Sequence, residues 1–131
     1  NEEGIRELEP TLAALATETG GRRKLMTGIL GEDRARLLIP VLARYAAELY
    51  LVRPDQPRAC SLEALAAAIP PAFPGKVVPV PTLAEGFPTA DVCPLVGPGE
   101  TLLVIGSIYL IGEVLQNLTP TPTEATLQDR F

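Results

Sequence analysis

Apolar and polar positions along this chain switch repeatedly between two spacings. Short continuous apolar runs are typical of strands covered on both faces, and apolar residues every three or four positions are typical of amphipathic helices. The runs predict strands at Lys24–Thr27, Glu48–Pro54, Lys76–Val80 and Leu102–Ile105. The helical spacing predicts helices at Ile5–Glu18, about 33–47, Leu62–Ile69, a partial helix at 82–86, and 107–118. The alternation indicates an α/β fold, a three-layer Rossmann-like, mainly parallel sheet with helices on both faces.

The clearest single unit is "TLLVIGSIYLIGEVL", residues 101–115. Its first half predicts a strand buried on both faces, and Ser107 stands where a helix N-cap belongs. The apolar residues that follow at helical spacing are Ile108, Ile111, Leu115 and Leu118. A strand, a Gly-Ser turn and a helix therefore follow one another, and the free N–H groups of such a helix start can hold an anion.

Prolines and one serine mark the limits of other elements. Pro10 and Pro40 fall inside predicted helices, where a proline kinks or splits a helix. Pro79 indicates either a strand at a sheet edge or the end of a strand. Ser61 is the expected N-cap of the Ala-rich helix. We expect one domain over residues 1–118 and an extended tail over 119–131. The pattern opens on a helix, which predicts that a first strand has been cut away.

Composition excludes several classes of function. The chain has 131 residues, 47% hydrophobic content and a net charge of −5, which predicts a single soluble, cytoplasmic domain without nucleic-acid or membrane partners. It contains no histidine, so His-dependent triads, bases and metal sites are ruled out. Cys60 and Cys93 match no zinc spacing and are expected to be reduced, buried thiols.

Three stretches at predicted strand ends are the candidates for binding. Gly106-Ser107 is either a simple turn with an N-cap or a ligand-holding turn; it has no accompanying Walker lysine. Arg58 in "QPRAC" is either a solvated loop residue or a carboxylate or phosphate ligand, and Arg53 is a weaker case of the same kind. "GILGEDR", residues 28–34, either caps a helix with Glu32-Asp33 or touches a ligand.

Together these stretches resemble the folylpolyglutamate synthase/dihydrofolate synthase family. "LLVIGSIYLIGEVL" is similar to the closing strand and helix of that family, with its apolar run, Gly-Ser, aromatic-containing apolar segment and Gly-Glu. "ELYLVRPDQPRACSLEALAAAI" resembles its strand, Pro-Arg-Ala and Leu-rich helix, and "NEEGIREL" resembles the residues after its first C-terminal-domain strand. The resemblance covers roughly residues 1–118, in order, and its Gly-Ser segment is the most specific part.

The resemblance implies a Mur-ligase-type C-terminal domain. Family enzymes use ATP and Mg²⁺ to turn a carboxylate of dihydropteroate or folate into an acyl phosphate, which the amino group of glutamate attacks. Nucleotide, metal and most of the folate bind to a preceding ATPase domain, which would be this chain's partner. By resemblance, Arg58 and Ser107 bind substrate and Asn1 and Gly106 adjoin the nucleotide, while catalytic and metal-binding residues lie elsewhere, so the chain alone is expected to be inactive.

The chain departs from the family pattern at two places. Only Asn1 remains of the family's Asp-Gly-Ala-His-Asn motif, and Glu32-Asp33-Arg34 stands where the family has an Asp-Lys-Asp run. Two other functions remain open, a stand-alone α/β module that binds a small anion or nucleotide, and an interaction domain without a ligand. We also expect dimerisation through the sheet edge that a missing strand would leave open.

Overall fold

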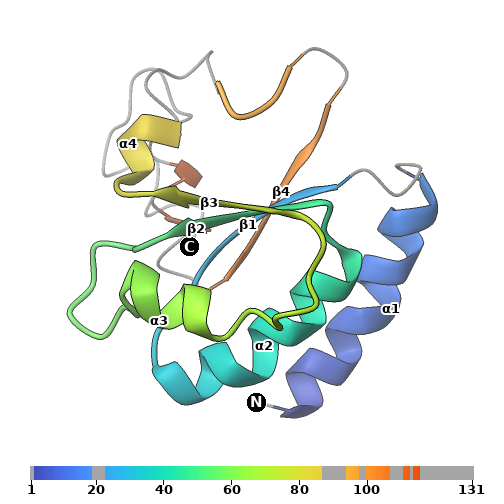
Figure 1. Ribbon diagram of the computed structural model, residues 1–131, viewed down its shortest axis with the longest axis horizontal. Helices are drawn as coiled ribbons and strands as arrows, with labels where there is room; N and C mark the ends of the chain where they lie inside the picture. Colours follow the sequence, from blue (N-terminus) through green and yellow to red (C-terminus); the bar gives the residue numbers. More distant parts are fainter. Residues whose placement is uncertain are drawn as a thin grey trace, which may run out of the picture.

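The protein is a four-stranded parallel sheet covered by helices. The computed structural model describes residues 2–18, 23–86, 94–97, 100–106, 111–112 and 114–115. The strands are β1 (Lys24–Gly28), β2 (Glu48–Val52), β3 (Lys76–Val80) and β4 (Leu102–Gly106), in the order β3-β2-β1-β4. All three strand pairs are parallel. The predicted α/β fold class is thereby confirmed (Figure 1).

The helices are distributed unequally over the two faces of the sheet. Figure 1 shows α1 (Glu2–Glu18), α2 (Glu32–Tyr45) and α3 (Leu62–Ala67) on one face, and the short α4 (Leu83–Gly86) on the other. In the part of the chain described, no helix combines the length and the apolar character that a membrane crossing requires.

Alternation along the strands divides the core in two. On β1, Leu25 faces the cluster formed with α1, α2 and α3, while its neighbour Met26 belongs to the cluster on the α4 side. Both side chains are fully buried. Successive strand residues point to opposite faces, so a continuous apolar run serves both clusters at once. This is why the predicted strands read as unbroken apolar runs rather than as alternating ones.

The helix limits agree closely with the sequence patterns. Pro10 lies inside α1 and Pro40 inside α2, and each helix continues through its proline. Ser61 is the N-cap of α3, because its Oγ accepts a hydrogen bond of 3.1 Å from the N–H of Ala64. Of the helix predicted over 107–118, residues 111–112 and 114–115 are helical. Its first turn and the 119–131 tail lie outside the described residues.

One end of the sheet agrees with the sequence patterns and the other does not. β3 is an edge strand, as Pro79 predicted. The expectation that Leu102–Ile105 is buried on both faces is wrong, since all four residues are only partly buried. β4 lies at the other end of the sheet and pairs only with β1 among the described strands. The apolar run of β4, which is typical of a strand in the interior of a sheet, therefore lies at an edge of the described sheet.

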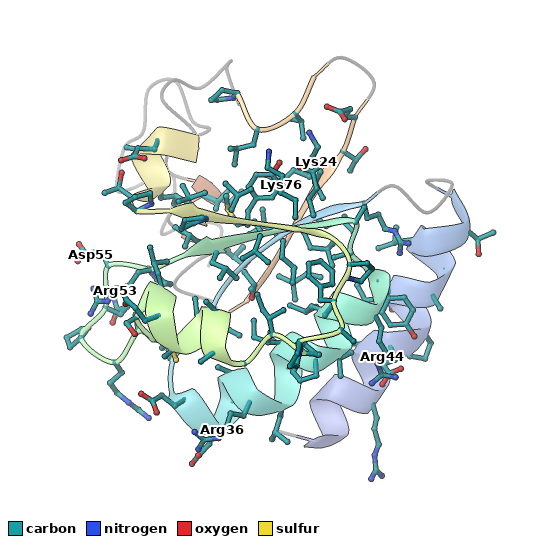
Figure 2. All side chains as sticks on the ribbon, in the orientation of Figure 1. Lys24, Arg36, Arg44, Arg53, Asp55 and Lys76 are labelled. Atoms are coloured by element: carbon teal, nitrogen blue, oxygen red, sulfur yellow. The ribbon has the colours of Figure 1, made fainter. Side chains whose placement is uncertain are left out.

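A polar cluster at the amino end of the sheet joins three separate segments. Lys24 Nζ lies 2.7 Å from the carbonyl oxygen of Leu95, 3.1 Å from Glu100 Oε1 and 3.9 Å from Glu48 Oε2. The N–H of Gly97 donates to the same Glu100 oxygen at 2.6 Å. Figure 2 shows Lys24 above the sheet, on the side away from α1 and α2. Lys24 thus ties the segment before β4 to the starts of β1 and β2.

Replacing Gly28 with alanine should destabilise the fold. A Cβ at position 28 would come within 2.6 Å of the carbonyl oxygen of Val52 and 2.8 Å of Pro54 Cδ. Neither the backbone nor the proline ring moves easily, so we expect a loss of about 1–3 kcal/mol in the free energy of unfolding. Urea denaturation measures it. Gly112→Ala is the matched control, because a Cβ there meets nothing within 4 Å, and equal losses in both variants would contradict the packing argument.

The Glu100 carboxylate should report on the Lys24 cluster through its titration. The N–H of Gly97, and then the Lys24 ammonium, lower the pKa of Glu100 below its ordinary value. These contacts favour the ionised form of Glu100. Their stabilisation is fully present at pH values above the ordinary pKa of a glutamate carboxyl, and it is lost as the pH falls through the lowered pKa of Glu100. We expect the Gly97 amide shift in NMR spectra to titrate with this low midpoint.

Two variants test the cause of that midpoint. Lys24→Met should raise the midpoint, because the neighbouring positive charge is removed. Glu100→Gln should abolish the titration while leaving the rest of the spectrum in place. A midpoint unaffected by Lys24→Met would show that lysine plays no part in holding the carboxylate.

Candidate functional site

The site lies at the carboxyl end of the sheet, beside the ends of β1 and β2; the order of the strands reverses on the other side of β1, between β1 and β4. From β1 the chain steps outward to β2 and then β3, and it returns to place β4 on the other side of β1. Gly28 and Gly106 are register partners at the ends of β1 and β4. Ligands of open α/β sheets bind in the crevice beyond the carboxyl ends of the strands at such a reversal. The topology therefore selects the carboxyl end of the sheet.

Backbone contacts hold two of the predicted stretches together. Leu30 and Ala59 form an antiparallel bridge. The N–H of Gly31 donates to the carbonyl oxygen of Arg58 at 3.2 Å, and the N–H of Cys60 donates to that of Ile29 at 2.8 Å. The loop after β1 and the loop after β2 are thus fixed against each other. Arg58 is placed by main-chain bonds rather than by its own side chain.

These two loops and the start of α2 enclose a hollow of about 420 Å³. Its lining consists of Leu30, Gly31, Glu32, Asp33, Arg34, Leu37 and Arg58. Gly31 precedes α2 with φ of 89°, a backbone region that side-chain-bearing residues rarely enter. The tight entry into α2 therefore depends on glycine, and it brings the first turn of the helix over the hollow.

The charges around the hollow are not balanced. Arg36 forms ion pairs with Glu32, at 3.8 Å, and with Asp33. Figure 2 shows Arg36 at the start of α2, on the outer side of that helix. The guanidinium groups of Arg34 and Arg58 make no hydrogen bond or ion pair with any described residue, and both side chains are exposed. Arg36 is shared by the two acids and offsets one of their two negative charges, and the two arginines are available to an external anion.

Arg34 ends the candidate stretch 28–34, but the sequence patterns did not single it out as a ligand-binding residue. It stands in the first turn of α2, where the partial positive charge of the helix end makes a cation unfavourable. A favourable local interaction therefore does not account for this arginine. The signal was present in the sequence, because "GEDR" places Arg34 within one turn of the glycine that begins the helix.

One wall of the hollow is apolar. Leu37, one turn further along α2, has 43% of its surface exposed and lines the hollow together with Leu30. Leu38 and Ile39, the next two residues, are buried in the core. The exposed leucine thus lies outside the packed stripe of α2, next to the two arginines. The hollow suits a small anion that carries an apolar portion.

The other predicted site residues are distributed as follows. Gly106 ends β4 beside Gly28, at the reversal of the sheet. Arg53 lies in the loop beyond β2, where Figure 2 shows it beside Asp55, and its Nη2 donates to the carbonyl oxygen of Gln56 at 3.3 Å. Arg53 is therefore engaged within its own loop. Asn1 and Ser107 lie outside the described residues, so their predicted contacts with nucleotide and substrate stay predictions.

Cys60 lies under the loop that carries Arg58. It is buried, as predicted, and burial and then the negative charge of Glu32 raise the pKa of its thiol. A thiol in that state is a poor nucleophile, and so Cys60 contributes packing. Cys93 lies outside the described residues. Among the side chains described, no group of three or more Cys, Asp or Glu residues is arranged to hold a metal ion.

Comparisons of the chain with protein-family models, with curated proteins and with solved structures find no match. The functional argument therefore rests on the geometry of the hollow and on the motifs in the sequence.

Proposed function

We propose that the chain is the C-terminal, Mur-ligase-type domain of an ATP-dependent ligase that adds glutamate to dihydropteroate or folate. The observation that supports the proposal is the pair of unengaged guanidinium groups, Arg34 and Arg58, in the hollow at the carboxyl end of the sheet. Glutamate carries two carboxylates, which guanidinium groups bind with two parallel hydrogen bonds. The resemblance of "PRAC" and "VIGSIYLIGEVL" to the ligase family motifs points to the same assignment.

In the proposed reaction this domain positions glutamate for attack on an acyl phosphate. The amino nitrogen of glutamate forms a bond to the acyl carbon, the bond from that carbon to the phosphate oxygen breaks, and the amine loses a proton. Arg58 would hold a carboxylate of the incoming glutamate, and Arg34 would neutralise the second one. Ser107 would contact the substrate, while Asn1 and Gly106 would adjoin the nucleotide. Holding the reactants in place removes the entropic cost of bringing them together.

ATP and Mg²⁺ belong to the full-length enzyme in this proposal. The sequence contains no Gly-x-x-x-x-Gly-Lys-Ser/Thr motif, and the described side chains offer no metal cluster. We therefore assign phosphate activation to a partner ATPase domain, and we expect the 131 residues alone to be inactive. The assignment places the enzyme in the cytoplasm, where folate and glutamate are available.

A second candidate function is a stand-alone α/β module that binds a small anion or a nucleotide. It is favoured by the fact that Arg34 and Arg58 line the same hollow within this one chain. Such a site would need no other domain to bind phosphate. The two functions differ in which ligand the isolated chain prefers.

Isothermal titration of the chain with glutamate, and separately with ATP, tests the proposal. We expect weak glutamate binding that Arg58→Ala reduces by about tenfold or more, because a charge-assisted hydrogen bond contributes roughly 1.5–3 kcal/mol. Arg44→Ala is the matched control. It also removes one positive charge, but from the last turn of α2, away from the hollow, where Arg44 pairs with Glu9.

The outcomes separate the two candidate functions. Glutamate affinity unchanged by Arg58→Ala, or reduced equally by Arg44→Ala, would count against the ligase assignment. Tight ATP or phosphate binding by the chain itself, lost with Arg34→Ala and Arg58→Ala, would favour the stand-alone module. Turnover of ATP by the purified chain would contradict the division of labour with an ATPase domain.

A further inference from the structure

The hollow at the carboxyl end of the sheet contains charges of both signs. Two arginines, Arg34 and Arg58, and two acids, Glu32 and Asp33, line it. Arg36 pairs with both acids and so offsets only one of their two negative charges. The hollow therefore offers two unengaged cations and one remaining anion. A ligand that matches this arrangement carries two negative groups and one positive group.

Glu32 is the acid whose carboxylate has open acceptor positions. Asp33 forms a hydrogen bond as well as an ion pair with Arg36. The contact between Glu32 and Arg36 is 3.8 Å long, which is beyond hydrogen-bond distance. Among the described residues, no donor forms a hydrogen bond with the Glu32 carboxylate, although a carboxylate can accept several. Its oxygens are therefore available to a donor that enters the hollow.

Glu32 adjoins the loop that carries Arg58. The N–H of Gly31, the residue before Glu32, donates to the carbonyl oxygen of Arg58 at 3.2 Å. The negative charge of Glu32 also contributes to the raised pKa of the thiol of Cys60, two residues after Arg58. The hollow thus has a carboxylate and a guanidinium on adjoining walls, an arrangement that suits the ammonium and the carboxylate of one amino acid.

We propose that the hollow binds an α-amino dicarboxylic acid as a zwitterion, with Glu32 holding its ammonium group while Arg58 and Arg34 hold its two carboxylates. The inference rests on the proposed function and adds the amino group, which is the nucleophile of the ligation, to the groups that this domain recognises. Leu30 and Leu37 also line the hollow and suit the methylene groups between the carboxylates. Inorganic phosphate carries no positive group, so the charge of Glu32 disfavours it.

Isothermal titration of the chain with glutamate and with glutarate tests the inference. Glutarate has the same carbon chain and both carboxylates but lacks the amino group. We expect glutamate to bind roughly tenfold more tightly than glutarate, because the hydrogen bond between ammonium and carboxylate is charge-assisted. Glu32→Gln should remove this difference by weakening glutamate binding. It should leave glutarate binding as tight as before or tighter, because one negative charge near the two carboxylates is removed.

Glu63→Gln is the matched control. It makes the same substitution in the first turn of α3, at an exposed residue outside the lining of the hollow. It should leave the affinities for glutamate and glutarate unchanged. Glu32 is also exposed, so neither variant is expected to disturb the core, and circular dichroism checks that both are folded.

The outcomes separate this inference from the proposed function. Equal affinities for glutamate and glutarate, both reduced by Arg58→Ala, would overturn the role of Glu32 and leave the ligase assignment in place. Equal weakening of glutamate binding by Glu32→Gln and Glu63→Gln would do the same. If neither ligand binds, or if Arg58→Ala changes neither affinity, the inference and the ligase assignment both fail.

Discussion

The structure depends on the pairing of β1 with strands on both of its sides. β1 pairs with β2, which follows it in the sequence, and with β4, which lies far away near the end of the described residues. It therefore connects the early strands to the last one. From Leu25 to Gly28 its residues are buried. Each backbone group of such a strand must find its partner in the ladder, because water does not reach it. A change that displaces β1 would therefore separate the halves of the sheet.

The contact between the loops that follow β1 and β2 determines where the candidate site lies. The loop after β1 and the loop after β2 leave the same end of the sheet, and their backbone bonds hold Arg58 beside the first turn of α2. Arg34 reaches the same hollow because Gly31 allows α2 to begin there. Two arginines and two acids line the hollow, in a chain with a net charge of −5, so the gathering of the two arginines is a matter of placement. Arg36 pairs with both nearby acids and offsets one of their two negative charges, while the side chains of Arg34 and Arg58 are exposed.

The amino end of the sheet serves a different purpose. There Lys24, Glu48 and Glu100 connect the starts of two strands to the segment that leads into β4. The Lys24 ammonium is matched by carboxylates and a carbonyl, and so it stabilises the structure rather than attracting a ligand. The Lys24 charge is thus engaged, whereas Arg34 and Arg58 share one hollow without a described partner, which is the physical basis for assigning the site to the carboxyl end.

Local patterns in the sequence determined the elements and much of their chemistry. The four strands, the N-cap at Ser61 and the edge position of β3 follow from apolar runs, a hydroxyl before a helix and a proline in a strand, all of which act over a few residues. The tertiary structure alone decided that β4 lies at an edge, because an apolar run has the same sequence whether one strand or two flank it. It also decided that Arg34 joins Arg58 while Arg36 pairs with the acids. Residues 34 and 36 differ in sequence by two positions, but a helix turns by about 200° over that step, and the fold determines which side meets the hollow.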